Sequence, residues 1–235
     1  MNKPKAIFCW SGGKDSAYCL NKVLTEQNYD VCYLLTTINA QYRRISMHGV
    51  REELLELQAD SIGIELLKVT VSEGRNEEYE QQMANVMLKA KAEGITHIIY
   101  GDIFLDDLRA YREKNMEQVG MTCVFPLWKT DTTWLIHDFI AKGFKTITTC
   151  INDEHLDEKY VGQTIDEEYI NSLPSRVDPC GENGEFHTFC YAGPLFKKPI
   201  EFTIGENVYK PLELNPDSDF KTNTKGFWFC DLRLD

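Results

Sequence analysis

The stretch Ala6-Ile7-Phe8-Cys9-Trp10-Ser11-Gly12-Gly13-Lys14-Asp15-Ser16 decides the fold class of this chain. Its apolar start predicts a buried strand over Ala6–Trp10, and the apolar spacing after the loop predicts a helix over Ser16–Gln27. The two glycines between them let the backbone approach a ligand closely. Because a loop between a strand and the amino end of a helix gathers N–H groups, we predict an anion site at Ser11–Ser16.

Strand and helix patterns keep alternating to about residue 151. Short runs rich in β-branched residues predict five more strands, and apolar residues at three- and four-residue spacing predict four more helices. This alternation predicts an α/β fold, with a buried parallel sheet that carries helices on both faces. The strands are expected over Val31–Ile38, Ile64–Val71, His97–Gly101, Met121–Phe125 and Lys145–Ile151, and the helices over Val50–Ser61, Asn76–Glu93, Ile103–Val119 and Thr132–Lys142.

The pattern changes after Ile151. Only short strand-like pieces follow, over Phe186–Tyr191, Glu201–Ile204 and Gly226–Leu232, separated by turns rich in proline and asparagine. We therefore expect a smaller C-terminal α+β domain. No linker marks the boundary, which we place so that residues 1–130 form the first domain and residues 131–235 the second.

Composition and charge limit the class of protein. The chain has 235 residues, 43% of them hydrophobic, and a formal net charge of −12. This acidic balance argues against nucleic acid as a partner, because backbone binding needs clustered lysine and arginine. No apolar run reaches the roughly 20 residues of a bilayer span, and the chain opens without a signal segment. The eight cysteines include no C-x-x-C pair, so we expect reduced thiols in a cytoplasmic protein.

Lys14 and Asp15 set the chemistry expected of the loop. Lys14 adds positive charge for phosphate, whereas a carboxylate at Asp15 suits a magnesium ion that bridges it to phosphate oxygens. The spacing differs from the Walker loop G-x-x-x-x-G-K-[ST]. The loop instead resembles the Ser-Gly-Gly-x-Asp-Ser signature of the PP-loop ATP pyrophosphatases, which cut ATP between its α- and β-phosphates. The resemblance implies a PP-loop, Rossmann-like ATP domain in which Ser11, Gly12, Gly13, Lys14, Asp15 and Ser16 bind ATP, with Lys14 and Asp15 catalytic and Asp15 on the metal.

Two later segments narrow this resemblance. They read Gly101-Asp102-Ile103-Phe104-Leu105-Asp106-Asp107-Leu108-Arg109-Ala110-Tyr111-Arg112-Glu113 and Asp178-Pro179-Cys180-Gly181-Glu182-Asn183-Gly184-Glu185-Phe186-His187-Thr188-Phe189. Together with the loop, they resemble the diphthine–ammonia ligase family over Ile7 to about Phe196. His187 stands where the archaeal and eukaryotic pattern has Glu, so the chain is more similar to a bacterial-type branch.

The resemblance implies an ATP-dependent carboxylate–ammonia ligase. ATP and Mg²⁺ would activate a substrate carboxylate as an adenylate, ammonia would displace AMP, and the product would be a primary amide. The ATP domain would be residues 1–130 and the substrate domain residues 131–235. The identity of the acid and the self-association of the chain stay open.

Further candidates follow from position and residue type. His48 lies in the region that the resemblance places near the adenine. Gly101 and Asp102 follow a predicted strand at the edge where ligands of open α/β sheets bind, although Asp102 also suits the N-cap of the next helix. Arg109 and Arg112 are three apart on that helix and could clamp an anion, or pair with nearby carboxylates on the surface.

The later segment predicts a substrate loop, because its polar side chains crowd ten residues. Carboxylates there could receive ammonium and accept its proton, with Glu185 the first candidate base and His187 the alternative. A metal site from Cys180, His187 and Cys190 lacks standard spacing. The substrate-binding candidates are Arg109, Arg112, Asp178, Cys180, Glu182 and Glu185, and the catalytic candidates in this segment are Glu185 and His187.

Two other functions use the same loop. A PP-loop enzyme that modifies tRNA would need a basic surface, which the composition does not favour. A nucleotide sensor without turnover would not need Asp15 or the dense polar segment near residue 180.

Overall fold

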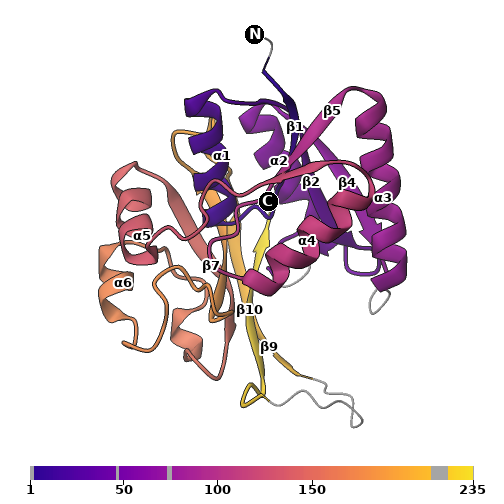
Figure 1. The fold of residues 1–235 in the computed structure, drawn as a ribbon. Helices are drawn as coiled ribbons and strands as arrows, with labels where there is room; N and C mark the ends of the chain where they lie inside the picture. The colour runs from indigo at the N-terminus through magenta and orange to yellow at the C-terminus, as the bar shows by residue number, and fades with distance from the viewer. Residues whose placement is uncertain (1–2, 46–47, 73–75, 213–221, 235) are drawn as a thin grey trace.

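The computed structural model describes residues 3–45, 48–72, 76–212 and 222–234. The first half forms a six-stranded sheet in the order β3-β2-β1-β5-β6, with β4 paired to the outer edge of β2 (Figure 1). All neighbours are parallel except β3, which runs antiparallel to β2. The strands are β1 (Lys5–Cys9), β2 (Asp30–Asn39), β3 (Arg44–Ile45), β4 (Glu65–Val71), β5 (Ile95–Ile99) and β6 (Thr122–Val124).

Helices cover both faces of this sheet, as predicted. Strand alternation in β1 points Phe8 to one face and Ile7 to the other, and both side chains are fully buried. Phe8 belongs to the cluster that contains α1 (Lys14–Glu26) and α2 (Glu52–Ile62), whereas Ile7 packs with α3 (Asn76–Ala92) and α4 (Asp106–Gln118). The predicted α/β class is therefore confirmed.

The second half contains an antiparallel sheet in the order β8-β7-β10-β9. The predicted strand over Lys145–Ile151 exists as β7, but it pairs in this second sheet and not in the parallel one. The strand expected over Glu201–Ile204 starts later and is longer. The elements are α5 (Thr132–Ala141), β7 (Lys145–Asn152), a 3-10 helix η1 (Glu158–Tyr160), α6 (Glu167–Ser172), β8 (Phe186–Ala192), β9 (Thr203–Pro211) and β10 (Gly226–Arg233).

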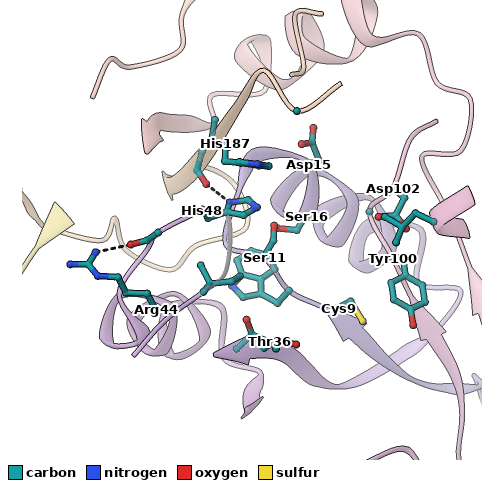
Figure 2. A pocket seen from close by; sticks show the side chains of 18 of the residues that line it. Cys9, Ser11, Asp15, Ser16, Thr36, Arg44, His48, Tyr100, Asp102 and His187 are labelled. Carbon is teal, nitrogen blue, oxygen red and sulfur yellow. Dashed lines mark hydrogen bonds between the residues drawn. The ribbon is translucent and has the colours of Figure 1, made fainter. Parts of the chain in front are cut away.

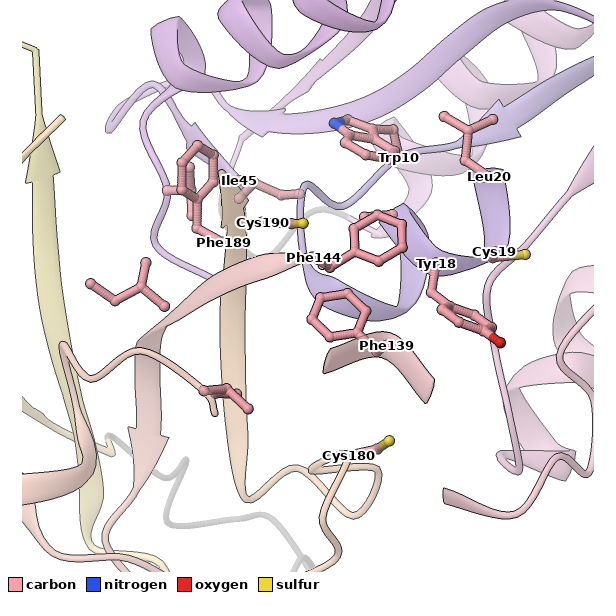
Figure 3. Packing of buried hydrophobic residues seen from close by; sticks show 14 of the residues in the cluster. Trp10, Tyr18, Cys19, Leu20, Ile45, Phe139, Phe144, Cys180, Phe189 and Cys190 are labelled. Carbon is pink, nitrogen blue, oxygen red and sulfur yellow. The ribbon is translucent and has the colours of Figure 1, made fainter. Parts of the chain in front are cut away.

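One hydrophobic core connects the two halves. Figure 3 shows Phe139 and Phe144 of the second half beside Tyr18 of α1. The rings of Phe139 and Phe144 stack 4.7 Å apart, and Tyr18 lies 6.3 Å from Phe144. This shared core fixes the second sheet against the loop that precedes α1. The boundary after residue 130 stays a prediction.

Two further features bear on the sequence expectations. α4 begins at Asp106 with Leu105 as its N-cap residue, so the helix predicted from Ile103 starts later and Asp102 is not its N-cap. All eight cysteines are free thiols. No helix within the described ranges is both long and apolar enough to cross a membrane.

Candidate active site

A cavity of about 950 Å³ opens at the carboxyl ends of β1, β2, β4 and β5. This is the edge at which open α/β sheets bind ligands, and the volume lies within the range of small-molecule sites. The second half closes the cavity with the segment 180–188 and with the β9–β10 hairpin. Of the predicted site residues, the lining includes Ser11, Lys14, Asp15, Ser16, His48, Gly101, Asp102, Arg112, Cys180, Glu182 and His187.

The loop Ser11–Ser16 is held by backbone and side-chain hydrogen bonds. Ser11 Oγ donates to Ser16 Oγ over 3.0 Å, and Ser16 Oγ donates to the carbonyl oxygen of Gly13 over 3.0 Å. Gly12 has φ +78°, and a Cβ there would lie 2.6 Å from Leu55 Cδ2. Only glycine therefore suits this position, both for its conformation and for space.

The second half also holds this loop. The backbone N–H of Lys14 donates to Thr188 Oγ1 over 3.0 Å, and the N–H of Cys190 donates to the Gly12 carbonyl oxygen over 2.8 Å. A Cβ on Gly13 would lie 3.1 Å from the Thr188 carbonyl oxygen. Strand β8 therefore determines the position of the loop although it lies far away in the sequence.

Lys14 joins the two halves through its side chain. Its Nζ forms an ion pair of 2.7 Å with Asp15 Oδ2 and also donates to the carbonyl oxygen of Cys180. The side chain of Lys14 is only 2% exposed, against 27% for Asp15. Burial alone lowers the pKa of Lys14, but the charges of Asp15 and Glu182 outweigh it and the pKa is raised. The ammonium group is therefore fixed beside the cavity in its charged form.

His48 and His187 lie side by side on one wall, with ring centroids 4.6 Å apart (Figure 2). His48 Nδ1 lies 3.1 Å from the Thr188 carbonyl oxygen, so Nδ1 carries the proton and Nε2 is an acceptor in the neutral ring. His187 Nε2 is buried and has no hydrogen-bond partner among the described residues. Burial lowers the pKa of both rings, that of His187 well below its usual value.

Asp102 and Arg112 form a pair on the opposite side of the cavity. Arg112 Nε lies 2.9 Å from Asp102 Oδ2, and the guanidinium lies 4.2 Å from the centre of the Tyr100 ring. Burial raises the pKa of Asp102, and Arg112 partly offsets this effect. Gly101 lets this segment approach α1, because a Cβ there would lie 3.3 Å from the Asp15 carbonyl oxygen.

The predicted arginine clamp is not assembled in the cavity. Arg109 donates to Glu113 Oε1 over 2.9 Å and lies over the rings of Phe125 and Trp128. Only Arg112 of this pair lines the cavity. We therefore assign Arg109 no contact with the cavity.

The segment 178–185 folds as a turn around two buried or half-buried carboxylates. Asp178 Oδ1 accepts from the N–H of Cys180 over 2.8 Å, and its Oδ2 accepts from Thr132 Oγ1 over 2.6 Å. Glu185 is 1% exposed and accepts from the N–H of Asp178 over 2.9 Å and from the N–H of Asn183 over 2.8 Å. Neither carboxylate lines the cavity, so both hold the turn in shape.

Glu182 is the carboxylate of this turn that lines the cavity. Burial, followed by the charge of Asp15, raises its pKa to about 8. Cys180 is 1% exposed and its Sγ donates to the Thr132 carbonyl oxygen over 3.4 Å. Burial raises the pKa of Cys180 above its usual range, which leaves a protonated thiol and no nucleophile.

Several contributors were not predicted from the sequence. Gln58 of α2 is fully buried, donates to the carbonyl oxygens of Gly12 and Cys190 and accepts from Trp10 Nε1. A polar residue on the apolar face of a predicted helix is the signal that could have found it. Thr188 lies inside the quoted late segment. Lys210, with its partners Tyr42 and Phe229, carries no local sequence signal.

The carboxylates that face the cavity fit a magnesium ion only together with ligand oxygens. No group of three His, Cys, Asp or Glu side chains in the described part of the chain could hold a metal ion alone. The metal site considered for Cys180, His187 and Cys190 is therefore not formed. Asp15 offers a hard oxygen ligand at the loop Ser11–Ser16, the donor type that Mg²⁺ prefers when it also binds phosphate.

Comparisons with known proteins identify the family. The family models described as the diphthamide synthase N-terminal and C-terminal domains match residues 4–123 and 131–213. The diphthine–ammonia ligases of Rattus norvegicus and Homo sapiens are 26% and 25% identical, each over 84% of this chain and 82% of the relative. That of Danio rerio is 26% identical over 84% of this chain and 86% of the relative.

Among solved structures, the U34-tRNA thiolase NcsA from Methanococcus maripaludis aligns with 60% of this chain and 58% of its own chain. Its sequence identity is 16% and its TM-score 0.36, too low to support an argument. The family matches span most of the sequence and confirm the predicted resemblance. The chain belongs to the diphthamide synthase family.

Proposed function

We propose that this protein uses ATP to join ammonia to a carboxylate, with AMP and pyrophosphate as the other products. Family membership and the names of the curated relatives support the reaction class. The observation that carries the proposal for this chain is the meeting of its two halves at Lys14. There the phosphate loop of the first half and the 178–188 segment of the second face one cavity.

The two halves would bind different substrates. Residues 1–130 would hold ATP through the loop Ser11–Ser16, and residues 131–235 would supply most of the wall for the second substrate. Lys14, held charged, would attract the phosphates, and Asp15 would share a magnesium ion with them. The magnesium ion would offset negative charge as pyrophosphate leaves.

The reaction would proceed in two displacements. An oxygen of the substrate carboxylate attacks the α-phosphorus of ATP, the bond to the β-phosphate breaks, and pyrophosphate leaves. Ammonia then attacks the carbonyl carbon of the adenylate, the carbon–oxygen bond to AMP breaks, and the amide forms. The nitrogen must lose one proton before the attack and one during it.

Glu182 is the best-placed acceptor for the first of these protons. It is a carboxylate of the predicted substrate loop that lines the cavity, whereas Glu185 is committed to backbone N–H groups. A carboxylate with a pKa near 8 can take a proton from ammonium more readily than an ordinary one. We therefore move the proposed base from Glu185 to Glu182, with Glu185 as a positioning residue.

The test is product analysis of labelled ATP with magnesium, ammonium and a panel of carboxylic acids. Ammonium-dependent AMP and pyrophosphate are expected, and Asp15→Ala should abolish both while the protein stays folded. Asp60→Ala, an exposed carboxylate change on α2 away from the cavity, is the control. ADP as the product, or full activity of Asp15→Ala, would overturn the proposal.

The alternatives receive less support. The curated relatives above are named as ligases and not as tRNA-modifying enzymes. A sensor would bind ATP without AMP formation under every substrate condition, which the same product analysis detects. We expect the reaction to take place in the cytoplasm.

A further inference from the structure

The positively charged side chains that line the cavity differ in one respect. Lys14 is paired with Asp15, Arg112 with Asp102, and Arg44 with Asp231. Lys210 also lines the cavity, yet it forms no ion pair with any carboxylate in the described part of the chain. It is therefore the lining cation whose charge remains available to a ligand.

Aromatic rings hold the Lys210 ammonium at its place. Its Nζ lies 5.3 Å from the ring centre of Tyr42 and 5.3 Å from that of Phe229. Tyr42 follows β2, and Phe229 lies on β10 beside the strand that carries Lys210. Rings within about 6 Å attract a cation without neutralising it. The rings thus orient the ammonium, and no carboxylate among the described residues forms an ion pair with it.

Arg44 is another cation of the lining, and its partner Asp231 lies outside the lining together with two further arginines. The carboxylate of Asp231 is shared by Arg44, Arg51 and Arg233, at 2.7, 2.9 and 2.7 Å. Three guanidinium groups on one carboxylate leave an excess of positive charge, although the whole chain has a net charge of −12. Figure 2 shows Arg44 at the opposite end of the pocket from Asp102.

Among the described residues, the rest of the lining offers an anion no unpaired cation. Lys14 is held by Asp15 and Arg112 by Asp102, and Glu182 lines the cavity beside them. Phosphates of ATP would occupy the loop Ser11–Ser16. A second anionic ligand group would therefore be attracted to the wall around Lys210, where an unpaired ammonium lines the cavity.

Resting on the function proposed above, we propose that Lys210, Tyr42 and Phe229 form a subsite for a second anionic group on the acid substrate. The substrate class is a carboxylic acid that carries a further carboxylate or phosphate. The anionic tail would lie at Lys210 while the reacting carboxylate lies at the loop beside the α-phosphate. Arg44 would add attraction from the lining of the same cavity.

The experiment measures binding and turnover separately. Binding of acetate, butyrate, succinate, glutarate and 3-phosphoglycerate is measured by titration calorimetry with a non-hydrolysable ATP analogue and magnesium present. We expect the dianionic acids to bind at least tenfold more tightly than the monocarboxylates. Comparison of dicarboxylate with phosphorylated acid identifies which anionic group the subsite prefers.

The variant Lys210→Gln should weaken dianion binding about tenfold, leave the monocarboxylates unchanged and leave the affinity for the ATP analogue unchanged. Lys210→Arg should retain most of the affinity, because it keeps the charge. Lys145→Gln makes the same charge change at an exposed position of β7 outside the cavity lining and should have no effect.

Three results would overturn the subsite. The first is equal affinity for monoanions and dianions, and the second is no binding of any dianion. The third is a loss of ATP-analogue affinity in Lys210→Gln as large as the loss of dianion affinity, which would assign this wall to the nucleotide. Because binding does not require turnover, the outcome is separate from that of the proposed reaction. If dianions bind in a way that depends on Lys210 but no ammonium-dependent AMP forms, the proposed ligase reaction is contradicted and the subsite is still supported.

Discussion

The backbone N–H of Lys14 donates a hydrogen bond to the side-chain oxygen of Thr188, 174 positions later in the chain, over 3.0 Å. Lys14 is the first residue of α1, and the N–H groups of a first helical turn have no partner within the helix. A residue of the second sheet therefore supplies the partner. The geometry of the loop Ser11–Ser16 depends on the docking of β8.

Thr188→Val should both destabilise the protein and weaken ATP binding. The substitution keeps the shape of the side chain but leaves a buried N–H without an acceptor, which costs about 1–3 kcal/mol. Thermal unfolding and ATP titration measure the two effects. Thr149→Val, at another buried threonine that makes only a 3.4 Å contact with a β8 carbonyl, is the control and should leave ATP affinity intact. Unchanged ATP affinity in Thr188→Val would contradict the dependence on β8.

Gly12→Ala should lower the free energy of unfolding much more than Gly94→Ala does. Both glycines have a left-handed backbone, with φ +78° and +81°, so both alanines incur similar strain of about 1–2 kcal/mol. The added Cβ at Gly12 would lie 2.6 Å from Leu55, whereas no heavy atom lies within 4 Å of it at Gly94. Overpacking should add about 1–3 kcal/mol at Gly12, measured by urea unfolding. Equal losses would show that the loop has room to relax.

Glu185→Gln should lower stability by about 1–3 kcal/mol, because an amide NH₂ would face N–H donors where a carboxylate oxygen accepted them. The loss should appear in thermal unfolding, together with weaker substrate binding as the turn loosens. Glu201→Gln, an exposed change, should be neutral. A Glu185→Gln protein of unchanged stability that fails only in the ammonium step would instead restore Glu185 as the base.

The fold and the meeting of the motifs followed from the sequence for a physical reason. Parallel strands bring their carboxyl ends to one edge, so the loop after β1 and Gly101-Asp102 after β5 were expected at the same edge, and the pairing of β1 with β5 makes them neighbours. The antiparallel pairing of β7 could not be foreseen, because a short apolar run gives no information about its partner.

The directions of individual side chains were less predictable. Arg109 and Arg112 are three residues apart on α4 and lie over the stacked rings of Phe125 and Tyr100, yet only Arg112 lines the cavity. Tertiary partners, and not helical spacing, decide between them. For the same reason, the crowd of carboxylates near residue 180 did not reveal that Glu182 lines the cavity while Glu185 is committed to the turn.

Glu182→Gln should stabilise the ligand-free protein at alkaline pH. The ordinary pKa of 4.5 is raised to about 8 on folding, so the folded protein holds an extra proton between these values and loses stability as pH rises through them. Glutamine has no such loss. We expect its melting temperature to match the parent near pH 4.5 and to exceed it by about 2–4 °C at pH 8.5. The exposed Glu168→Gln is the control, and a pH-independent difference would contradict the raised pKa.

Asp231→Asn should destabilise the protein at neutral pH by on the order of 1 kcal/mol after allowance for solvent screening. Burial alone raises the pKa of Asp231, but hydrogen bonds from Arg51, Arg233 and Arg44 outweigh it and hold the pKa far below its usual range. The stabilisation is therefore complete above the unfolded pKa of 3.8 and is lost as pH falls below it. The two proteins should differ in melting temperature at pH 7 and converge toward pH 2. Asp157→Asn, at a carboxylate 84% exposed, is the control and should have the melting temperature of the parent at either pH. If the melting temperature of Asp231→Asn stays below that of the parent in acid, packing and not charge joins β10 to α2.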